Sequence, residues 1–123
     1  MPVRAVRGAI TVENNTPEEI LEETANMLKA IVEKNQIEKD DIISAFFSVT
    51  KDLDAAFPAA AARKIGWTDI ALMCTNEIDV PGSLQKCIRV MVHFNTNKAN
   101  SELVHVYMKG AKVLRPDIST DKE

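Results

Sequence analysis

The stretch from Cys87 to Phe94 reads Cys-Ile-Arg-Val-Met-Val-His-Phe, and it most constrains what the chain can fold into. Its period-two alternation is typical of a β-strand with one face in the core. The core face would carry Ile88, Val90, Val92 and Phe94, and the other face Cys87, Arg89, Met91 and His93. A guanidinium keeps its proton, so a shielded arginine needs an anion or hydrogen-bond acceptors beside it. The strand has no acidic residue, so the partner of Arg89 is a distant carboxylate or an anionic ligand.

The overall composition is that of an ordinary globular protein. At 123 residues the chain is long enough for one domain with a real core, and we expect residues 1–123 to form that domain. A formal net charge of −3 argues against a nucleic-acid binder, which usually carries a basic face. Arginines inside apolar strands of an acidic protein therefore indicate a local anion site.

The sequence favours a cytoplasmic location. No run approaches the roughly 20 apolar residues of a membrane span, and the N-terminal residues lack the pattern of a signal peptide. Cys74 and Cys87 lie in apolar segments without metal or redox spacing, so we expect free thiols in a reducing compartment. The polar residues 116–123 are expected to form a mobile C-terminal tail.

The apolar pattern predicts an α/β domain with about five strands, one long helix and one short helix. The expected strands are 3–12 (loosened at Gly8), 42–50, 69–75, 87–94 and 103–108.

The helices are expected at 17–35 and 57–66. For the long helix, Thr16 is the predicted N-cap and Glu19 would complete a capping box. Gly66 would end the short helix.

The sequence lacks the usual catalytic motifs. Four glycines form no phosphate-binding loop, and no serine or cysteine sits in a nucleophile motif. His93 and His105 are not spaced like metal ligands, and each more plausibly caps or lines a strand. We therefore predict neither a metal nor another cofactor.

Four polar residues remain on strand faces or strand ends: Arg7, Glu77, Arg89 and Tyr107. Taken singly, each has a structural explanation: the arginines could pair internally with Glu77 or Asp79, and the tyrosine could be half-buried in the core. Taken together, two arginines and a tyrosine favour a pocket for a small carboxylate-bearing molecule. Such a pocket either binds a metabolite or catalyses through positioning and electrostatics alone.

The sequence resembles the small, monofunctional bacterial chorismate mutases of the non-helical, trimeric class. The resemblance covers nearly the whole chain, and its blocks together are more specific than any one of them. The blocks are 4–13 (RAVRGAITVE), 54–59 (DAAFPA), 74–84 (CTNEIDVPGSL), 87–90 (CIRV), 105–107 (HVY) and 114–117 (LRPD).

The resemblance implies a fold, an assembly and a reaction. It implies a mixed five-stranded sheet with helices on one side, and a homotrimer that forms a pseudo-α/β barrel with an active site between each pair of neighbours. The implied reaction is the concerted [3,3] rearrangement of chorismate to prephenate in phenylalanine and tyrosine biosynthesis. It needs no covalent intermediate, cofactor or metal.

The resemblance also implies roles for individual residues. Arg89 would donate to the ether oxygen, where negative charge develops, and Arg7 with Tyr107 would hold the side-chain carboxylate. Glu77 would accept from the ring hydroxyl and orient both arginines. The neighbouring subunit's wall would be lined by Phe57, Ala59, Leu72, Met73 and Cys74. Arg63 and Arg115 would lie near the mouth, with the tail from Leu114 folding over the ligand.

Two positions depart from the family pattern. The best-known members carry lysine where this chain has Ala60, and often threonine where it has Met73. The loss of a positive charge at Ala60 would weaken steering of a dianionic substrate. Neither change touches the four central polar residues.

Two other functions remain compatible with the residues alone. Rid-type enamine or imine deaminases use an interface arginine on a similar trimeric fold, although their glycine-rich motifs are not evident here. A non-catalytic trimer that binds a carboxylate metabolite would need much the same residues.

Overall fold

The computed structural model describes residues 1–114, and they form five strands and two α-helices. The strands are β1 (Val3–Thr11), β2 (Ile42–Val49), β3 (Ala71–Asn76), β4 (Cys87–Asn95) and β5 (Val106–Met108). The helices are α1 (Pro17–Asn35) and α2 (Ala59–Lys64). Short 3₁₀ turns occupy Lys39–Asp41, Asn100–Glu102 and Lys109–Val113. The predicted tail and Arg115 lie outside the described residues.

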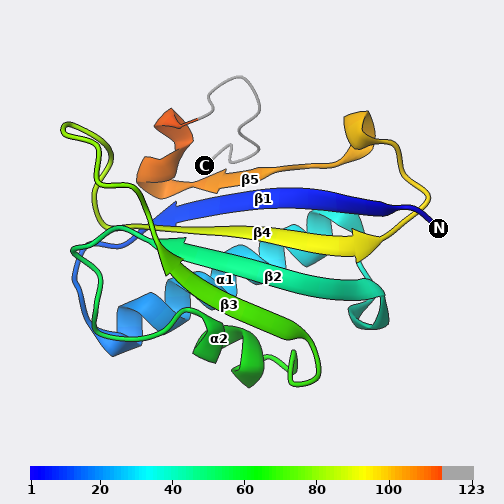
Figure 1. The fold of residues 1–123 in the computed structure, drawn as a ribbon, viewed down its shortest axis with the longest axis horizontal. Helices are drawn as coiled ribbons and strands as arrows, with labels where there is room; N and C mark the ends of the chain where they lie inside the picture. The colour runs from blue at the N-terminus through cyan, green and yellow to red at the C-terminus, as the bar shows by residue number, and fades with distance from the viewer. Residues whose placement is uncertain (115–123) are drawn as a thin grey trace.

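All five strands form one mixed sheet in the order β3-β2-β4-β1-β5 (Figure 1). The three central strands pair antiparallel, whereas each edge strand runs parallel to its neighbour. The two helices share one face of this sheet, and their buried residues form a single core with the inward strand faces. The predicted mixed sheet with one long and one short helix is therefore confirmed. In the part of the chain that the structure describes, no α-helix covers the opposite face, which we call the uncovered face.

The alternation predicted for the arginine-bearing strand is confirmed. Ile88, Val90, Val92 and Phe94 are buried in the core beneath the helices. The last strand is shorter than predicted, because the chain before Val106 leaves the ladder. At this position the His105 side chain, rather than a strand backbone, accepts from β1. Its Nδ1 accepts a hydrogen bond from the Arg7 backbone N–H at 3.0 Å.

The long helix begins and ends where the sequence predicts. Thr16 is the N-cap, and its Oγ1 accepts from the Glu19 N–H at 3.2 Å. The prediction that Glu19 completes a capping box, by accepting from the backbone N–H of Thr16, is wrong. The Glu19 carboxylate accepts from the backbone N–H groups of Glu13 and Asn14 instead, because the chain before the helix turns back over its N-terminus. In the short helix, Gly66 follows the C-terminus with φ of 103°, a conformation that favours glycine.

Gly8 does not loosen the first strand, contrary to the sequence expectation. It sits in regular register opposite Val90 on one side and Val106 on the other. A Cβ at this position would lie 2.6 Å from Ile31 Cδ1 and 3.2 Å from Met27 Cγ. The glycine therefore lets α1 approach the sheet closely.

Replacing Gly8 with alanine is expected to destabilise the protein. The added methyl group overpacks a core that is already filled, at a typical cost of about 1–3 kcal/mol. Denaturant unfolding would measure this as a lower transition midpoint. The double variant Gly8→Ala/Ile31→Val removes the methyl group that clashes most, so it should recover part of the loss relative to Ile31→Val alone. A Gly8→Ala variant as stable as the parent would contradict this account.

Within residues 1–114, no helix has the length and apolar character that a membrane crossing requires.

Candidate active site

The strand register places five side chains in one row across the uncovered face of the sheet. Thr75 lies opposite Ser48, Ser48 opposite Arg89, Arg89 opposite Ala9, and Ala9 opposite Tyr107. These residues come from all five strands. We call these five residues the polar row, because all of them except Ala9 are polar, and it exists only when the whole sheet has assembled.

A cavity of about 270 Å³ opens over this row. All four polar residues singled out from the sequence line it: Arg7, Glu77, Arg89 and Tyr107. Their gathering in one place is what the anion-site hypothesis requires. Four further lining residues are Phe46, Ser48, Thr75 and Met91.

Glu77 is fixed to β2 at both its backbone and its side chain. It follows the end of β3, and its N–H donates to the Val49 carbonyl at 2.9 Å. Its Oε2 accepts a hydrogen bond from Ser48 Oγ. The same Oε2 lies 3.4 Å from Arg89 Nε in an ion pair. One carboxylate oxygen thus faces both the serine hydroxyl and the guanidinium.

The ion pair leaves part of Arg89 unsatisfied. Its Nε is buried and makes no hydrogen bond within the described residues, although Glu77 is near. The Arg89 side chain as a whole is 39 % exposed, against 24 % for the side chain of Glu77. Internal pairing with Glu77, the structural alternative raised by the sequence, is therefore present, but it coexists with a cavity and an unused donor. A buried donor without an acceptor is costly, so it indicates a position where a ligand atom would be favourable.

Tyr107 and Cys87 belong to a small buried cluster beside the cavity, together with Ala9 and Ala111. Leu114 packs against this cluster from the chain's C-terminal side. Tyr107 is 4 % exposed, so it is more buried than the half-buried tyrosine of the structural alternative. Its ring is therefore held rigidly where it borders the cavity.

Burial raises the pKa of the Cys87 thiol from 9.0 to about 11, and the nearby Arg89 guanidinium opposes that rise. The unfolded chain would release this proton near its ordinary pKa, whereas the folded chain retains it to about pH 11. Folded protein thus binds more protons between these values, and the free energy of unfolding should fall by roughly 2 kcal/mol as pH rises from 9 to 11. Denaturation at several pH values, in reductant, would measure this slope. Cys87→Ala should make it shallower, and an unchanged slope would contradict the assignment.

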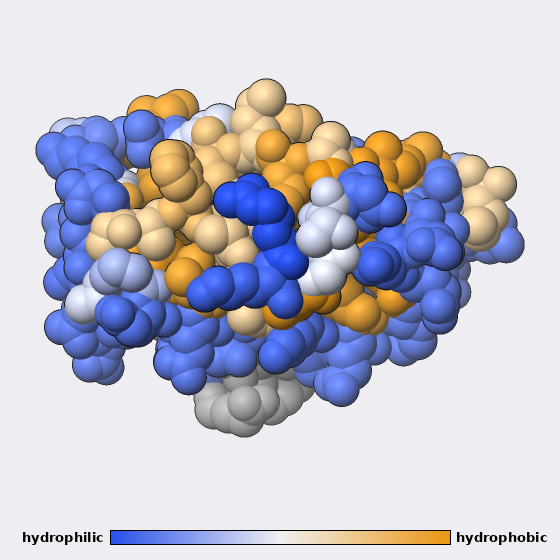
Figure 2. Space-filling view, turned by 90° about the horizontal axis from the view of Figure 1, so that it is seen from below, coloured by the Kyte–Doolittle hydropathy of each residue, from blue (hydrophilic) through white to orange (hydrophobic). Residues whose placement is uncertain are grey.

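A second row, made of apolar residues, runs beside the polar one. Met73, Phe46 and Met91 are register neighbours, and Arg7 lies opposite Met91. Their exposed fractions are 56, 44 and 38 %, which is high for large apolar side chains. We call Met73, Phe46 and Met91 the apolar row. Seen from the side of α2 and β3, apolar residues gather over the upper part of the surface, whereas hydrophilic residues lie at the centre and cover the lower margin (Figure 2).

The structure does not bring the remaining predicted site residues to this cavity within one chain. Phe57 and Arg63 are exposed beside or on α2, and Ala59 is buried in that helix. Leu72 and Cys74 face the core side of β3 and are partly buried. Only Met73 of that strand segment points to the uncovered face, as a member of the apolar row.

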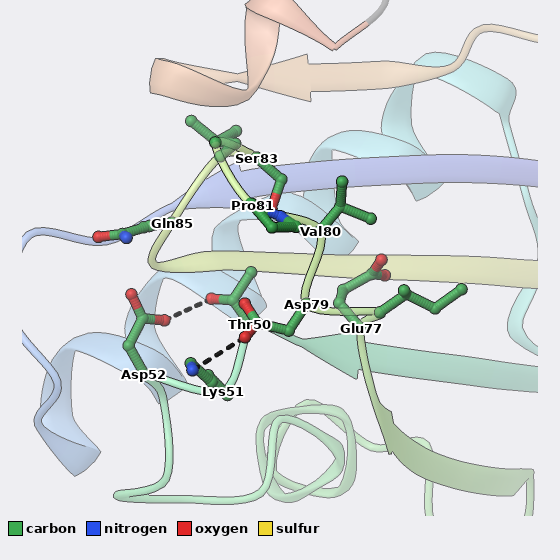
Figure 3. Close-up of a pocket in the computed structure, with 12 residues that line it drawn as sticks. Thr50, Lys51, Asp52, Glu77, Asp79, Val80, Pro81, Ser83 and Gln85 are labelled. Atoms are coloured by element: carbon green, nitrogen blue, oxygen red, sulfur yellow. Dashed lines mark hydrogen bonds and ion pairs between the residues drawn. The ribbon is translucent and has the colours of Figure 1, made fainter.

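A second cavity, of about 230 Å³, lies under the loop that joins β3 to β4. Beside this loop, Lys51 Nζ pairs with Asp79 Oδ2 at 2.8 Å, and Thr50 donates to Asp52 (Figure 3). Asp79, which the sequence left open as an internal partner for an arginine, is thus paired with Lys51 instead. The ion pair links the loop that follows Glu77 to Lys51, just beyond the end of β2, and both side chains are largely exposed.

The two histidines line strands, as predicted. His93 packs edge-on against Phe46, with ring centroids 5.7 Å apart, and His105 caps the edge of β1. Among residues 1–114 there is no group of three or more histidine, cysteine or acidic side chains suited to a metal ion.

Ser48 and Thr75 are the site residues that sequence reasoning missed. Ser48 lies between buried Phe47 and Val49, and the exposed Thr75 follows the partly buried Cys74, so period two could have assigned both to the uncovered face. Their link to Arg89 depends on strand order and register, which the sequence does not reveal.

Comparisons with known proteins show the family to which the chain belongs. The model of the family described as chorismate mutase type I matches residues 3–118. Chorismate mutase AroH of Bacillus subtilis is 44 % identical over 123 residues, which cover 99 % of this chain and 97 % of that protein. Chorismate mutase AroH of Thermus thermophilus is also 44 % identical, over 96 % of this chain and 98 % of that protein.

A solved structure is similar as well. The chorismate mutase from Clostridium thermocellum is 64 % identical, with a TM-score of 0.88, covering 89 % of this chain and 98 % of its own. The chain belongs to the chorismate mutase type I family, an isomerase family, and the resemblance drawn from the sequence is confirmed.

Proposed function

We propose that the cavity over the polar row binds chorismate and accelerates its rearrangement to prephenate. In this reaction a C–O bond breaks while a C–C bond forms, and no proton leaves or enters the substrate. The cavity needs only to hold the folded substrate and to stabilise the charge that grows on the ether oxygen. The observation that carries the proposal is Arg89, whose side chain borders the cavity and whose buried Nε makes no hydrogen bond within the described residues.

In the proposed mechanism, Arg89 donates to the ether oxygen as the C–O bond lengthens. A preorganised donor at a site of developing charge lowers the barrier, because it interacts more strongly with the transition state than with the substrate. Glu77 would accept from the ring hydroxyl and keep Arg89 oriented through their 3.4 Å contact. Arg7 and Tyr107 would hold the side-chain carboxylate, which is consistent with their place around the cavity.

We further propose that three copies assemble through the uncovered face of the sheet into a barrel with shared sites. The apolar row supports this, because three large apolar side chains in register are costly to leave in water. The neighbouring copy would then line each cavity with Phe57, Ala59, Leu72, Met73 and Cys74, and Arg63 and Arg115 would lie near the mouth, beside Leu114. We also propose that the protein works in phenylalanine and tyrosine synthesis, in the cytoplasm. Its two free cysteines are consistent with such a reducing compartment.

The direct test is an assay with purified protein and chorismate. The loss of the diene absorbance is followed, and acid then converts any prephenate to phenylpyruvate for detection. We expect acceleration well above the thermal background. The absence of acceleration would refute the catalytic proposal and leave the alternative of a non-catalytic binder, whereas release of ammonia from an enamine would favour the deaminase alternative.

Replacing Ala60 with lysine is expected to raise kcat/KM mainly at low ionic strength. Ala60 lies in α2 near the proposed mouth, and a lysine there would add positive charge on the path of a dianionic substrate. Salt screens such long-range attraction, so the gain should shrink between 10 mM and 500 mM salt. Ala60→Gln is the matched control without charge. A gain that does not depend on salt would argue against steering.

A further inference from the structure

The hydroxyl group of Ser48 has a place in the site that neither the four central residues nor the proposed mechanism explains. Ser48 lies on β2, directly opposite Arg89 on β4 and Thr75 on β3. Its Oγ donates to Glu77 Oε2, and its side chain borders the cavity. A hydroxyl in this position competes with Arg89 for the same carboxylate oxygen.

This competition explains why the Glu77–Arg89 contact is incomplete. Glu77 Oε2 lies 3.4 Å from Arg89 Nε, longer than an ordinary N–H···O hydrogen bond of about 2.9 Å. Arg89 Nε is buried and makes no hydrogen bond within the described residues. Without the serine hydroxyl, the carboxylate would be free to turn onto Nε and close a direct hydrogen bond. The guanidinium would then use its donor on Glu77 rather than on a ligand.

We propose that Ser48 is a positioning residue, which holds the Glu77 carboxylate back from Arg89 Nε and keeps the guanidinium available to the cavity. This inference rests on the proposed mutase activity and extends it to a residue outside the four central ones. Ser48 does not touch the reacting atoms, and it acts through Glu77. Its effect should therefore appear in the chemical step rather than in substrate capture.

The sharpest test compares Ser48→Thr with Ser48→Val, because these side chains have nearly the same shape and differ in the hydroxyl. A β-branched side chain also suits a strand position. We expect Ser48→Thr to keep at least half of the parent kcat and Ser48→Val to lose about tenfold, with KM changed less than threefold. A tenfold loss corresponds to one hydrogen bond to a charged group. Ser48→Ala should behave like Ser48→Val.

Ser44→Ala is the matched control. Ser44 is on the same strand and the same face, where its Oγ lies 3.4 Å from His93 Nδ1 and away from the cavity. This change should leave kcat within twofold of the parent. Equal losses in Ser44→Ala and Ser48→Ala would mean that any polar group on this strand matters alike, and would overturn the proposal.

A double-mutant cycle separates positioning from a general structural effect. If Ser48 acts through Glu77, Ser48→Ala should change kcat less than twofold in a Glu77→Ala background. A tenfold loss that persists in that background would overturn the proposal. So would a parent-like kcat of both Ser48→Val and Ser48→Ala.

A crystal structure of Ser48→Ala gives a readout that does not depend on activity. We expect Glu77 to close onto Arg89 Nε, with a distance near 2.9 Å in place of 3.4 Å. An unchanged distance would overturn the positioning role, whatever the assay shows. If the parent protein does not accelerate the chorismate reaction, the proposed function fails, and this structure still decides how Ser48 acts on the ion pair.

Discussion

Replacing Arg89 with alanine is expected to lower kcat by more than a hundredfold while leaving the fold and assembly intact. The Arg89 side chain borders the cavity and its buried Nε makes no hydrogen bond within the described residues, and loss of one preorganised donor typically costs about 3 kcal/mol of transition-state stabilisation. Loss of a full charge should cost more. The chorismate absorbance assay measures kcat, and light scattering with thermal unfolding checks the assembly and the fold.

Arg89→Lys tests the geometric part of the same account. Lysine keeps the charge but lacks the planar fork and the Nε donor of arginine, so it should also lose most of the activity. Arg4→Ala is the matched control, because it removes the same charge from β1 at a side chain that donates to the Lys98 carbonyl instead. Near-normal turnover of Arg89→Lys would refute the assignment of Arg89 as an oriented donor.

Replacing Phe46 with glutamate is expected to break the proposed trimer into single chains and to abolish activity. Phe46 is the middle member of the apolar row, between Met73 and Met91, and it is 44 % exposed in the single chain. If three copies bury this face, the change would place a charge in each apolar interface without a partner, which costs several kcal/mol. Sedimentation velocity would report the loss of the trimer directly.

Phe46→Leu keeps an apolar side chain at the same position and serves as the control. It should remain assembled and retain most of the activity, although Phe46 also borders the cavity. A Phe46→Glu variant that stays trimeric would show that the uncovered face is not the interface. A parent protein that sediments as a monomer would contradict the assembly itself.

The elements of the fold were largely predictable because their signals are local. Thr16, Pro17 and the apolar stripe that follows define α1, and alternation from Cys87 to Phe94 defines β4. The wrong predictions for Gly8 and for the length of β5, by contrast, arise from contacts between residues far apart in the sequence. Nothing near Gly8 in the sequence indicates that α1 would pack against it, and β5 begins only at Val106, after the His105 ring has accepted a hydrogen bond from the Arg7 N–H.

The sequence by itself determined which residues are chemically unusual and what they could bind. It singled out Arg7, Glu77, Arg89 and Tyr107 because charged or polar groups in apolar strands need partners, whatever the fold. Its resemblance to a known family also supplied the reaction, because the order of several moderately specific blocks is itself specific.

Only the tertiary structure decided how these residues meet. The polar row joins residues from five strands, and strand order with register sets each neighbour, including the missed Ser48. Those pairings join segments far apart in the sequence, and no local signal encodes them. The orientation of the Glu77 carboxylate between Ser48 and Arg89 is decided by hydrogen bonds that form only after the sheet has assembled.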